Sequence, residues 1–528
     1  MGGKTELIFI GLVTIGLLAI LARRIRVPYP ILLTIGGVVL ALIPGLPIIH
    51  LEPEMVFNLF LPPLIYPAAV FTSWRDFRAN LRPILLLAIG LVLFTMTAIA
   101  YLFHYLAGLP LSVGFVFGAV ISPPDAVAAL AITHNLRVPR KIVVILEGES
   151  LVNDATSFIS FRFAVAAVMT GGFSLSQAGL RFLVVAAGGI CVGVAVGWLA
   201  TQVQKRLDDP PVQTMFSLLT PYVAYFGAET AHVSGILAVV IAGMYYGWQA
   251  PRILSGRMRL QALPVWDMVV FILNGVLFML IGLELPQVIH ALPPSSTLQV
   301  AKLALLVVSA VVLVRFVWMF GASYLPRLLS RTLRHEATAP WQHTALIAWT
   351  GMRGADSLAG ALAIPFALPN GESFPGRNLI LLLTFCVIFG TLVLQGLTLS
   401  PLIGWLRVVD DRVTEKEERL ARLKANEAAL ARLDAMESLN RTRPEVVERL
   451  RSEYVDRIGQ LRSRDPRREG LSGLYSPDFE ELAREALQIE RNTVIQLRND
   501  ESISDQALRR IQRDIDLAEA RLQSSTAR

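Results

Sequence analysis

The sequence predicts an all-α protein that crosses a membrane many times and continues into a charged helical tail. Hydrophobic residues make up 54% of the 528 residues and charged residues 17%, whereas a soluble domain has about 25% charged residues. The mean hydropathy is +0.55. The charges are unevenly placed, since residues 1–408 are mostly apolar and 409–528 are dense in Glu, Asp and Arg. We therefore expect a membrane domain over 1–408 and a soluble domain over 409–528.

Thirteen apolar runs are long enough to span a bilayer as helices, which takes about 20 residues each. The predicted spans are 6–22, 29–46, 55–71, 82–106, 111–133, 142–169, 178–203, 212–228, 232–248, 264–283, 299–323, 342–366 and 378–406. Cys191 and Cys386 both fall within these spans, so no disulfide framework is expected.

The basic residues of the loops support this set of spans and orient it. The loops after odd-numbered spans hold the clusters Arg23/Arg24/Arg26, Arg75/Arg78/Arg82, Arg137/Arg140/Lys141, Lys205/Arg206, Arg252/Arg257/Arg259 and Arg327/Arg331/Arg334. The loops after even-numbered spans are nearly bare, with Arg181 and Arg377 as exceptions. Basic residues mark cytoplasmic loops, so we expect the N-terminus outside and the tail in the cytoplasm. The net charge of +7 is explained by these loops, and no nucleic-acid partner is expected.

The first span should remain in the mature protein, because its basic cluster follows the apolar run instead of preceding it. The tail is predicted to be helical from Glu415, because Leu and Ala recur at helical spacing in Glu418–Leu423 and again around Leu450 and Leu461. Pro466 and the Gly- and Pro-containing stretch that follows it interrupt the helices. Solvated amphipathic helices are the simplest interpretation, and a role in regulation or dimerisation is the alternative.

The motif Ser122-Pro123-Pro124-Asp125 predicts a broken helix inside a membrane span. Two adjacent prolines remove backbone donors and interrupt the helix. Broken backbone at membrane depth is tolerated where it is buried in protein or lines a cavity. Asp125 would then begin a half-helix, whose positive end favours a carboxylate, and ion sites of secondary transporters lie at such breaks. The alternative is a simple proline kink with Asp125 as a helix cap.

A second group of polar residues lies in the sixth span, over Glu149 to Asp154. Charged side chains in hydrocarbon are expensive, and they usually face the interior of the bundle and handle ions or protons. Ser150 and Asp154 share a helix face, with Asn153 beside them. Their oxygens suit a monovalent cation, and Asp154 could exchange that cation for a proton. Glu149 points elsewhere on the helix and needs its own partner, so a structural role is the favoured interpretation for it.

Two arginines lie within predicted spans, Arg315 in span 11 and Arg353 in span 12. A guanidinium keeps its charge, so each should pair with a carboxylate or with backbone carbonyls. The glycines of Gly351–Gly354 indicate a second broken helix or a close backbone crossing. If span 7 links two six-helix halves, the two interrupted spans hold corresponding positions, which is typical of internal repeats. The residues alone do not fix whether that repeat is inverted.

Pro62 and Pro63 predict a further break or kink, in span 3. By contrast, Glu229 and His232 are interpreted as interfacial groups near an external loop. The sequence carries no G-x-S-x-G motif, no H-E-x-x-H motif and no phosphate-binding Gly loop, so no cofactor is expected. A gated cation channel, a signalling sensor, and an intramembrane enzyme using Ser150 with His134 remain as other hypotheses.

Taken together, the motifs resemble those of the monovalent cation/proton antiporters of the sodium/proton exchanger type, including bacterial NhaP-like proteins. The resemblance covers about residues 5–406. The matching motifs are Phe60–Ala68, Ser122–Leu130, Gly148–Asp154, Arg315 and Gly351–Gly354. It implies a helical fold of two inverted six-helix repeats with crossed broken helices, a homodimer in the cell (inner) membrane, and elevator-like alternating access.

The resemblance also implies roles for individual residues. Asp154 would be the principal carboxylate for the cation and the proton, assisted by Asn153 and Ser150, with Asp125 at the crossed, unwound helices. Three further residues would have structural roles: Arg315 would pair with Glu149, and Arg353 would balance the helix ends at the crossing. An Asn-Asp pair is similar to the electroneutral branch, in which sodium or another monovalent cation exchanges for one proton.

The chain departs from the family pattern at two places. The family often has Asp-Pro at the first break, whereas this chain has Pro124-Asp125-Ala126. The family also often has an acidic residue shortly after the Pro-Pro pair of span 3, where this chain has Pro67. The preference among sodium, potassium and lithium is therefore left open.

Overall fold

The structure is a computed structural model. It describes residues 2–25, 29–43, 56–125, 138–172, 175–254, 256–290, 297–329, 340–408, 420, 423–431, 444–462, 515 and 517. The chain divides into two compact units, Met1–Asp410 and Asp411–Arg528.

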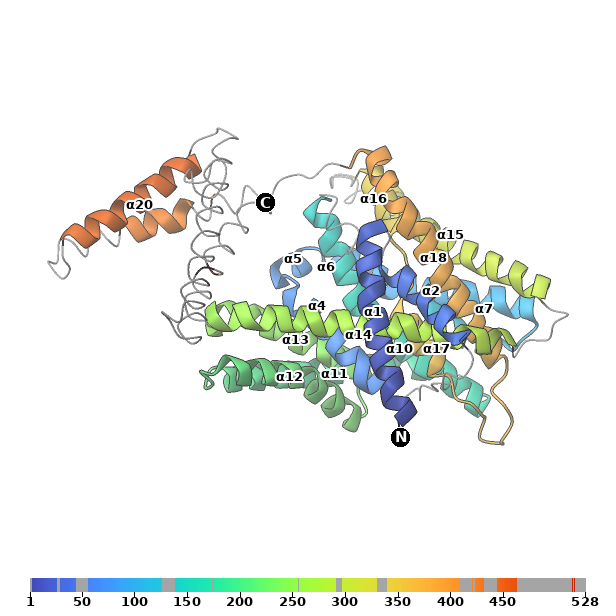
Figure 1. Cartoon of the computed structure of the whole chain (residues 1–528). Helices are drawn as coiled ribbons and strands as arrows, with labels where there is room; N and C mark the ends of the chain where they lie inside the picture. Colours follow the sequence, from blue (N-terminus) through green and yellow to red (C-terminus); the bar gives the residue numbers. More distant parts are fainter. Residues whose placement is uncertain are drawn as a thin grey trace. The chain divides into compact units, whose positions relative to one another are not determined.

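The described part of the first unit is almost entirely helical (Figure 1). Its α-helices and π-helical segments (η) are α1 (Gly2–Ile25), α2 (Tyr29–Ala41), η1 (Val56–Phe60), α4 (Leu61–Phe71), α5 (Trp74–Ala79), α6 (Leu81–Leu85), η2 (Leu86–Leu91), α7 (Val92–Ala107), α8 (Leu111–Ile121), α10 (Arg140–Thr170), α11 (Leu175–Gln204), α12 (Pro210–Thr230), α13 (Gly235–Ile253), α14 (Gly256–His290), α15 (Thr297–Leu329), α16 (Trp341–Trp349), α17 (Ala355–Leu362) and α18 (Arg377–Leu406). The prediction of a mostly helical protein is confirmed.

Each predicted span contains one of these helices or a run of adjacent helical segments. Six helices of the described part are long and apolar enough to cross a membrane, and four shorter helices are also apolar. The end of predicted span 5, over 126–133, lies outside the described residues, as does His134. The total of thirteen crossings and the repeat therefore remain predictions.

The helices of the first unit pack in two groups. Helices α7, α8, α10 and α15–α18 pack mainly among themselves, and α1, α2, α4 and α11–α14 form a second set. Figure 1 shows α11, α12 and α13 side by side. Small residues let such helices approach closely. On α8, for example, a Cβ added at Gly114 would lie 2.5 Å from the backbone oxygen of Ala100 on α7.

Several helices expose large apolar side chains on their outer faces. On α11, Leu180, Leu183 and Trp198 are more than half exposed, and on α15 Leu305 and Leu313 are also more than half exposed. A soluble protein rarely leaves such continuous apolar surface in water. These faces therefore fit contact with lipid, as expected for a multi-pass membrane protein.

In the second unit, α20 (Pro444–Arg462) contains Leu450 and Leu461, around which the sequence predicts helix. Arg462 forms an ion pair with Glu427 at 2.7 Å, between α20 and the helical residues 423–431. Glu415, Pro466 and most other residues of the predicted tail lie outside the described residues.

Candidate functional site

Two interrupted helices meet inside the first unit. Helix α8 ends at Ile121, and Ser122–Asp125 are not helical. Helices α16 and α17 are separated by the non-helical residues 350–354. The backbone N–H of Asp125 donates a hydrogen bond of 2.7 Å to the carbonyl oxygen of Met352. The chain therefore leaves the helix at Pro123-Pro124 and around Arg353, as predicted, and this hydrogen bond satisfies one backbone group of each non-helical segment.

The contact between the breaks is close because of a glycine. A Cβ added at Gly354 would collide with Oδ2 of Asp125. Gly354 is therefore needed for the second break to lie directly against the first. The half-helix predicted to follow Asp125 lies outside the described residues.

Helix α10 passes this crossing without interruption and is hydrogen-bonded to the first break. Nδ2 of Asn153 donates to the carbonyl oxygen of Pro124 at 3.2 Å. Oγ of Ser157 donates to the carbonyl oxygen of Ala119, near the end of α8, at 2.7 Å. Asn153 and Ser157 are one turn apart on the same face of α10. The sequence analysis selected Asn153 but not Ser157. The four-residue spacing between them would have placed Ser157 on the same helix face.

Asp154 lies beside these contacts and is 3% exposed. Its Oδ1 atom and Oδ1 of Asn153 have no hydrogen-bond partner among the described residues. Asp154 interacts electrostatically with Asp356 and Asp125. Ser150 lies one turn before Asp154 on α10 and is partly buried. The site thus offers oxygen atoms with unused lone pairs, which suit a hard cation or a proton.

No group of three or more His, Cys, Asp or Glu side chains in the described part is arranged to hold a metal ion by itself. A monovalent cation bound at Asp154 and Asp125 would therefore also need oxygens of other kinds. Such oxygens are close to Asp154. They belong to the amide of Asn153, the hydroxyl of Ser150 and the backbone carbonyls of the non-helical segments.

Arg315 and Glu149 form a buried ion pair next to the crossing. Nη1 and Nη2 of Arg315 donate to Oε1 and Oε2 of Glu149 at 2.5 and 2.8 Å, and both side chains are 2% exposed. Nε and Nη2 of Arg315 also donate to the carbonyl oxygen of Ile347 on α16. The predicted pairing is therefore present, and it ties together α15, α10 and α16.

Arg353 lies fully buried in the second break. Its backbone N–H donates to Oγ1 of Thr391 on α18 at 3.0 Å. Its guanidinium interacts electrostatically with Glu149 and Arg315, and its Nε and Nη1 have no hydrogen-bond partner among the described residues. The charge is thus held at the point where helices end, where carbonyl groups carry partial negative charge.

Pro62 and Pro63 do not break their helix, and the kink that was the other expectation for span 3 remains a prediction. The backbone is helical from Val56 to Phe71 and changes from π-helix to α-helix between Phe60 and Leu61. The two prolines occupy the first positions of α4. Proline is tolerated there because the first N–H groups of an α-helix need no intrahelical acceptor.

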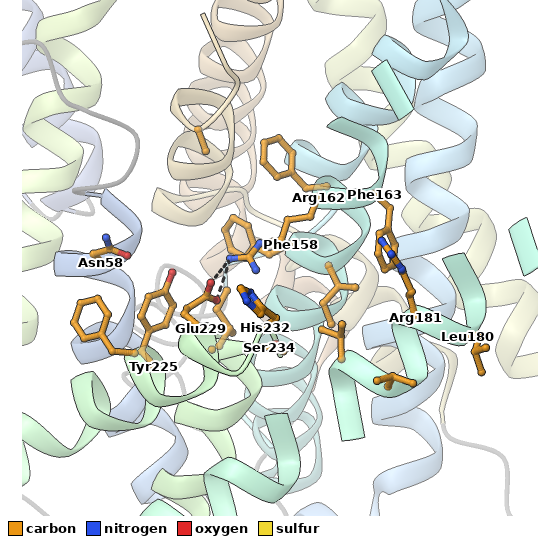
Figure 2. A pocket seen from close by; sticks show the side chains of 18 residues that line it. Asn58, Phe158, Arg162, Phe163, Leu180, Arg181, Tyr225, Glu229, His232 and Ser234 are labelled. Carbon is orange, nitrogen blue, oxygen red and sulfur yellow. Dashed lines mark hydrogen bonds and ion pairs between the residues drawn. The ribbon is translucent and has the colours of Figure 1, made fainter. Parts of the chain in front are cut away.

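A cavity of about 970 Å³ opens along α10 beyond Asp154 (Figure 2). Phe158, four residues after Asp154, lines it, and Arg162 follows after four more. Figure 2 shows Arg162 and Glu229 facing each other, with Nη2 of Arg162 at 3.0 and 2.9 Å from the two oxygens of Glu229. His232 lies on the same lining. Sequence reasoning treated Glu229 and His232 as interfacial and did not single out Arg162.

Non-helical segments that meet beside a buried carboxylate, inside a helical membrane domain, are typical of secondary ion transporters. The chain also matches the family model described as sodium/hydrogen exchanger, transmembrane, over residues 10–405. It therefore belongs to the sodium/hydrogen exchanger family, as its motifs predicted.

Known proteins similar to the chain agree with this assignment. An uncharacterized Na⁺/H⁺ exchanger of Mycobacterium tuberculosis is 35% identical and covers 98% of this chain and 97% of its own length. The sodium, potassium, lithium and rubidium/H⁺ antiporter of Bacillus pumilus is 36% identical over 72% of this chain and 58% of its own length. The solved structure of the sodium proton antiporter MjNhaP1 from Methanocaldococcus jannaschii, 18% identical, matches the fold with a TM-score of 0.60 over 76% of this chain and 98% of that one.

Proposed function

We propose that the protein is a secondary active antiporter that exchanges a monovalent cation, sodium before potassium or lithium, for protons at Asp154. The observation that carries this proposal is the position of Asp154. It is buried at the crossing of two broken helices, and its Oδ1 atom has no hydrogen-bond partner in the described part of the chain. Family membership supports cation/proton exchange as the activity.

Competition at one carboxylate couples the two fluxes. Asp154 binds either a proton or a cation, so each can bind only after the other has left. Asn153 and Ser150 supply further oxygens to the cation, and Asp125 contributes from the unwound segment. One cation exchanges for one proton, which makes transport electroneutral. Protonation of Asp154 at low pH stops the exchange.

The remaining site residues hold the crossing in place. Glu149 and Arg315 fix α10 against α15 and α16, and their bidentate geometry supports this role. Arg353 balances the partial charges of the helix ends. Pro123 and Pro124 keep the first segment unwound, because neither can donate a backbone hydrogen bond.

The larger organisation follows the family. We propose thirteen membrane crossings over 1–408 as two inverted six-helix repeats, a homodimer in the inner membrane, and a cytoplasmic tail over 409–528. With the N-terminus outside, the cavity of Figure 2 is the outer approach to Asp154, because α10 enters from the cytoplasmic side. The two packing groups of helices are the parts that move against each other during alternating access. The physiological role is pH and cation homeostasis.

Purified protein in liposomes that contain a pH-sensitive dye tests the proposal. Addition of sodium, potassium or lithium outside should drive proton release from the lumen, with the initial rates ranking the cations. An electroneutral exchanger gives the same rate when potassium and valinomycin clamp the membrane potential. A gated channel would instead give cation currents without obligatory proton movement, and a sensor would give neither.

A further inference from the structure

Each of the two helix breaks leads directly to a carboxylate. In the first break, Asp125 follows Pro123-Pro124. In the second, Asp356 lies in the first turn of α17, just after Arg353-Gly354. The family motif in this chain ends at Gly354, and neither the motif nor the charge balance at the helix ends gives Asp356 a role.

The backbone contacts place these two carboxylates at the same crossing. Met352 accepts a hydrogen bond from the N–H of Asp125. Gly354 lies so close to the Asp125 carboxylate that a Cβ would not fit. Asp356 is only two residues further on, and it interacts electrostatically with Asp125. Asp154 interacts with both. We refer to Asp125, Asp154 and Asp356 as the carboxylate triad.

The charges around the triad are unequal. Arg315 and Arg353 are the cationic side chains among the buried residues of the described part. Arg315 is already paired with Glu149. Asp154 interacts with two further carboxylates, and like charges grouped in this way favour the arrival of a positive charge.

The members of the triad also differ in accessibility. Asp154 and Asp125 are 3% and 6% exposed, whereas Asp356 is only partly buried. Asp356 is therefore the most accessible member of the triad. In addition, Oδ1 of Asp154 and Oδ1 of Asn153 have no hydrogen-bond partner among the described residues and are available to receive a cation.

We propose that Asp356 is a further residue of the exchange site, which draws the monovalent cation toward Asp154 and sets the affinity and preference for that cation. This inference rests on the proposed function. Each further negative charge near a bound cation raises the affinity for that cation. Coulomb attraction increases as the charges approach, so the smaller ions lithium and sodium gain more from this carboxylate than potassium does.

The test compares Asp356→Asn with the unchanged protein, both full-length and reconstituted in liposomes. The cation concentration at half-maximal exchange should rise at least about tenfold for sodium, because the attraction of one nearby unit charge is lost. The rise should be larger for lithium and smaller for potassium, and the maximal rate should stay within about threefold. Asp356→Glu, which keeps the charge, should restore most of the affinity.

Glu372→Gln is the matched control, because it neutralises an exposed carboxylate on the loop between α17 and α18. It should leave the half-maximal concentration unchanged. If Asp356→Asn does not fold, Asp356→Ser provides a smaller neutral side chain for which the same shift is expected.

Two results separate this inference from the proposed function. Exchange by the unchanged protein together with an unaltered half-maximal concentration in Asp356→Asn would overturn the role of Asp356 alone. A lower maximal rate at unchanged half-maximal concentration would also overturn it, because a merely structural residue behaves in that way. Absence of cation-driven proton movement in the unchanged protein would instead overturn the proposed function.

Discussion

Glu149 and Asp154 are two buried carboxylates on the same helix, five residues apart, with opposite surroundings. Both are almost completely removed from solvent, at 1% and 3% exposure. Five residues turn the helix by about 140° beyond one full turn, so the two side chains face different neighbours. Glu149 meets the guanidinium of Arg315 in bidentate geometry. Asp154 meets other carboxylates and keeps one oxygen without a hydrogen-bond partner in the described part.

This difference indicates how a buried carboxylate can be suited either to stabilising the fold or to binding an ion. A buried charge with a complete set of partners has little to gain from a ligand, and its removal exposes the partner's charge. A buried charge without such a partner gains from any cation or proton that arrives. In the proposed mechanism, pairing with a fixed guanidinium therefore separates the structural carboxylate from the exchanging one.

The largest effect on stability is expected for Glu149→Gln. It leaves Arg315 buried without its carboxylate, which costs about 3–5 kcal/mol. Thermal unfolding of the detergent-solubilised protein should show a large loss of stability, and Arg315→Gln should show a similar one.

The exchanged pair Glu149→Arg with Arg315→Glu should recover part of that loss, because the two charges again face each other. Two mutations that share one interaction are not additive. If the effects of the single changes simply add in the double variant, the pairing does not contribute to stability as described.

Gly354→Ala should strongly reduce exchange while the helical bundle still forms. The added methyl group collides with the Asp125 carboxylate and separates the two breaks. Gly404→Ala on α18 is the matched control, because a Cβ there meets nothing within 4 Å. Initial rates of sodium-driven proton release measure the difference, and equal rates in the two variants would show that close contact of the breaks is unnecessary.

The smallest effect on stability is expected for Glu229→Gln, which breaks the ion pair with Arg162 at the cavity of Figure 2. The two side chains are 28% and 55% exposed. Solvent screens such pairs, so the cost should be at most about 1 kcal/mol. If Glu229→Gln lowered the unfolding temperature as much as Glu149→Gln does, burial would not determine how much an ion pair stabilises this protein.

Local features of the sequence predicted much of the fold. The apolar runs located the helices, because length and hydropathy are properties of one segment. The break at Pro123-Pro124 followed from proline chemistry, and that at Gly351–Gly354 from a cluster of glycines. The break considered at Pro62-Pro63 is absent because proline interrupts a helix only when its position requires an N–H donor. The preceding π-helical segment removed that requirement.

The site was predicted less completely, because its contacts join residues far apart in the chain. Ser157 and Arg162 continue the face of Asn153 and Asp154 along α10, but their partners lie on other helices. Asp356 lies two residues after the Gly351–Gly354 motif, which the sequence analysis considered only for its arginine and glycines. Only the contact between the two breaks brings it near Asp125 and Asp154.

Sodium-driven proton release by Asp154→Asn in liposomes tests the central claim most directly. The substitution keeps the size of the side chain and removes the charge that we propose binds both ions. We expect no exchange, while thermal stability stays close to that of the unchanged protein because no guanidinium loses its partner. Exchange at a rate near that of the unchanged protein would contradict the account, since the cation and the proton would then compete elsewhere.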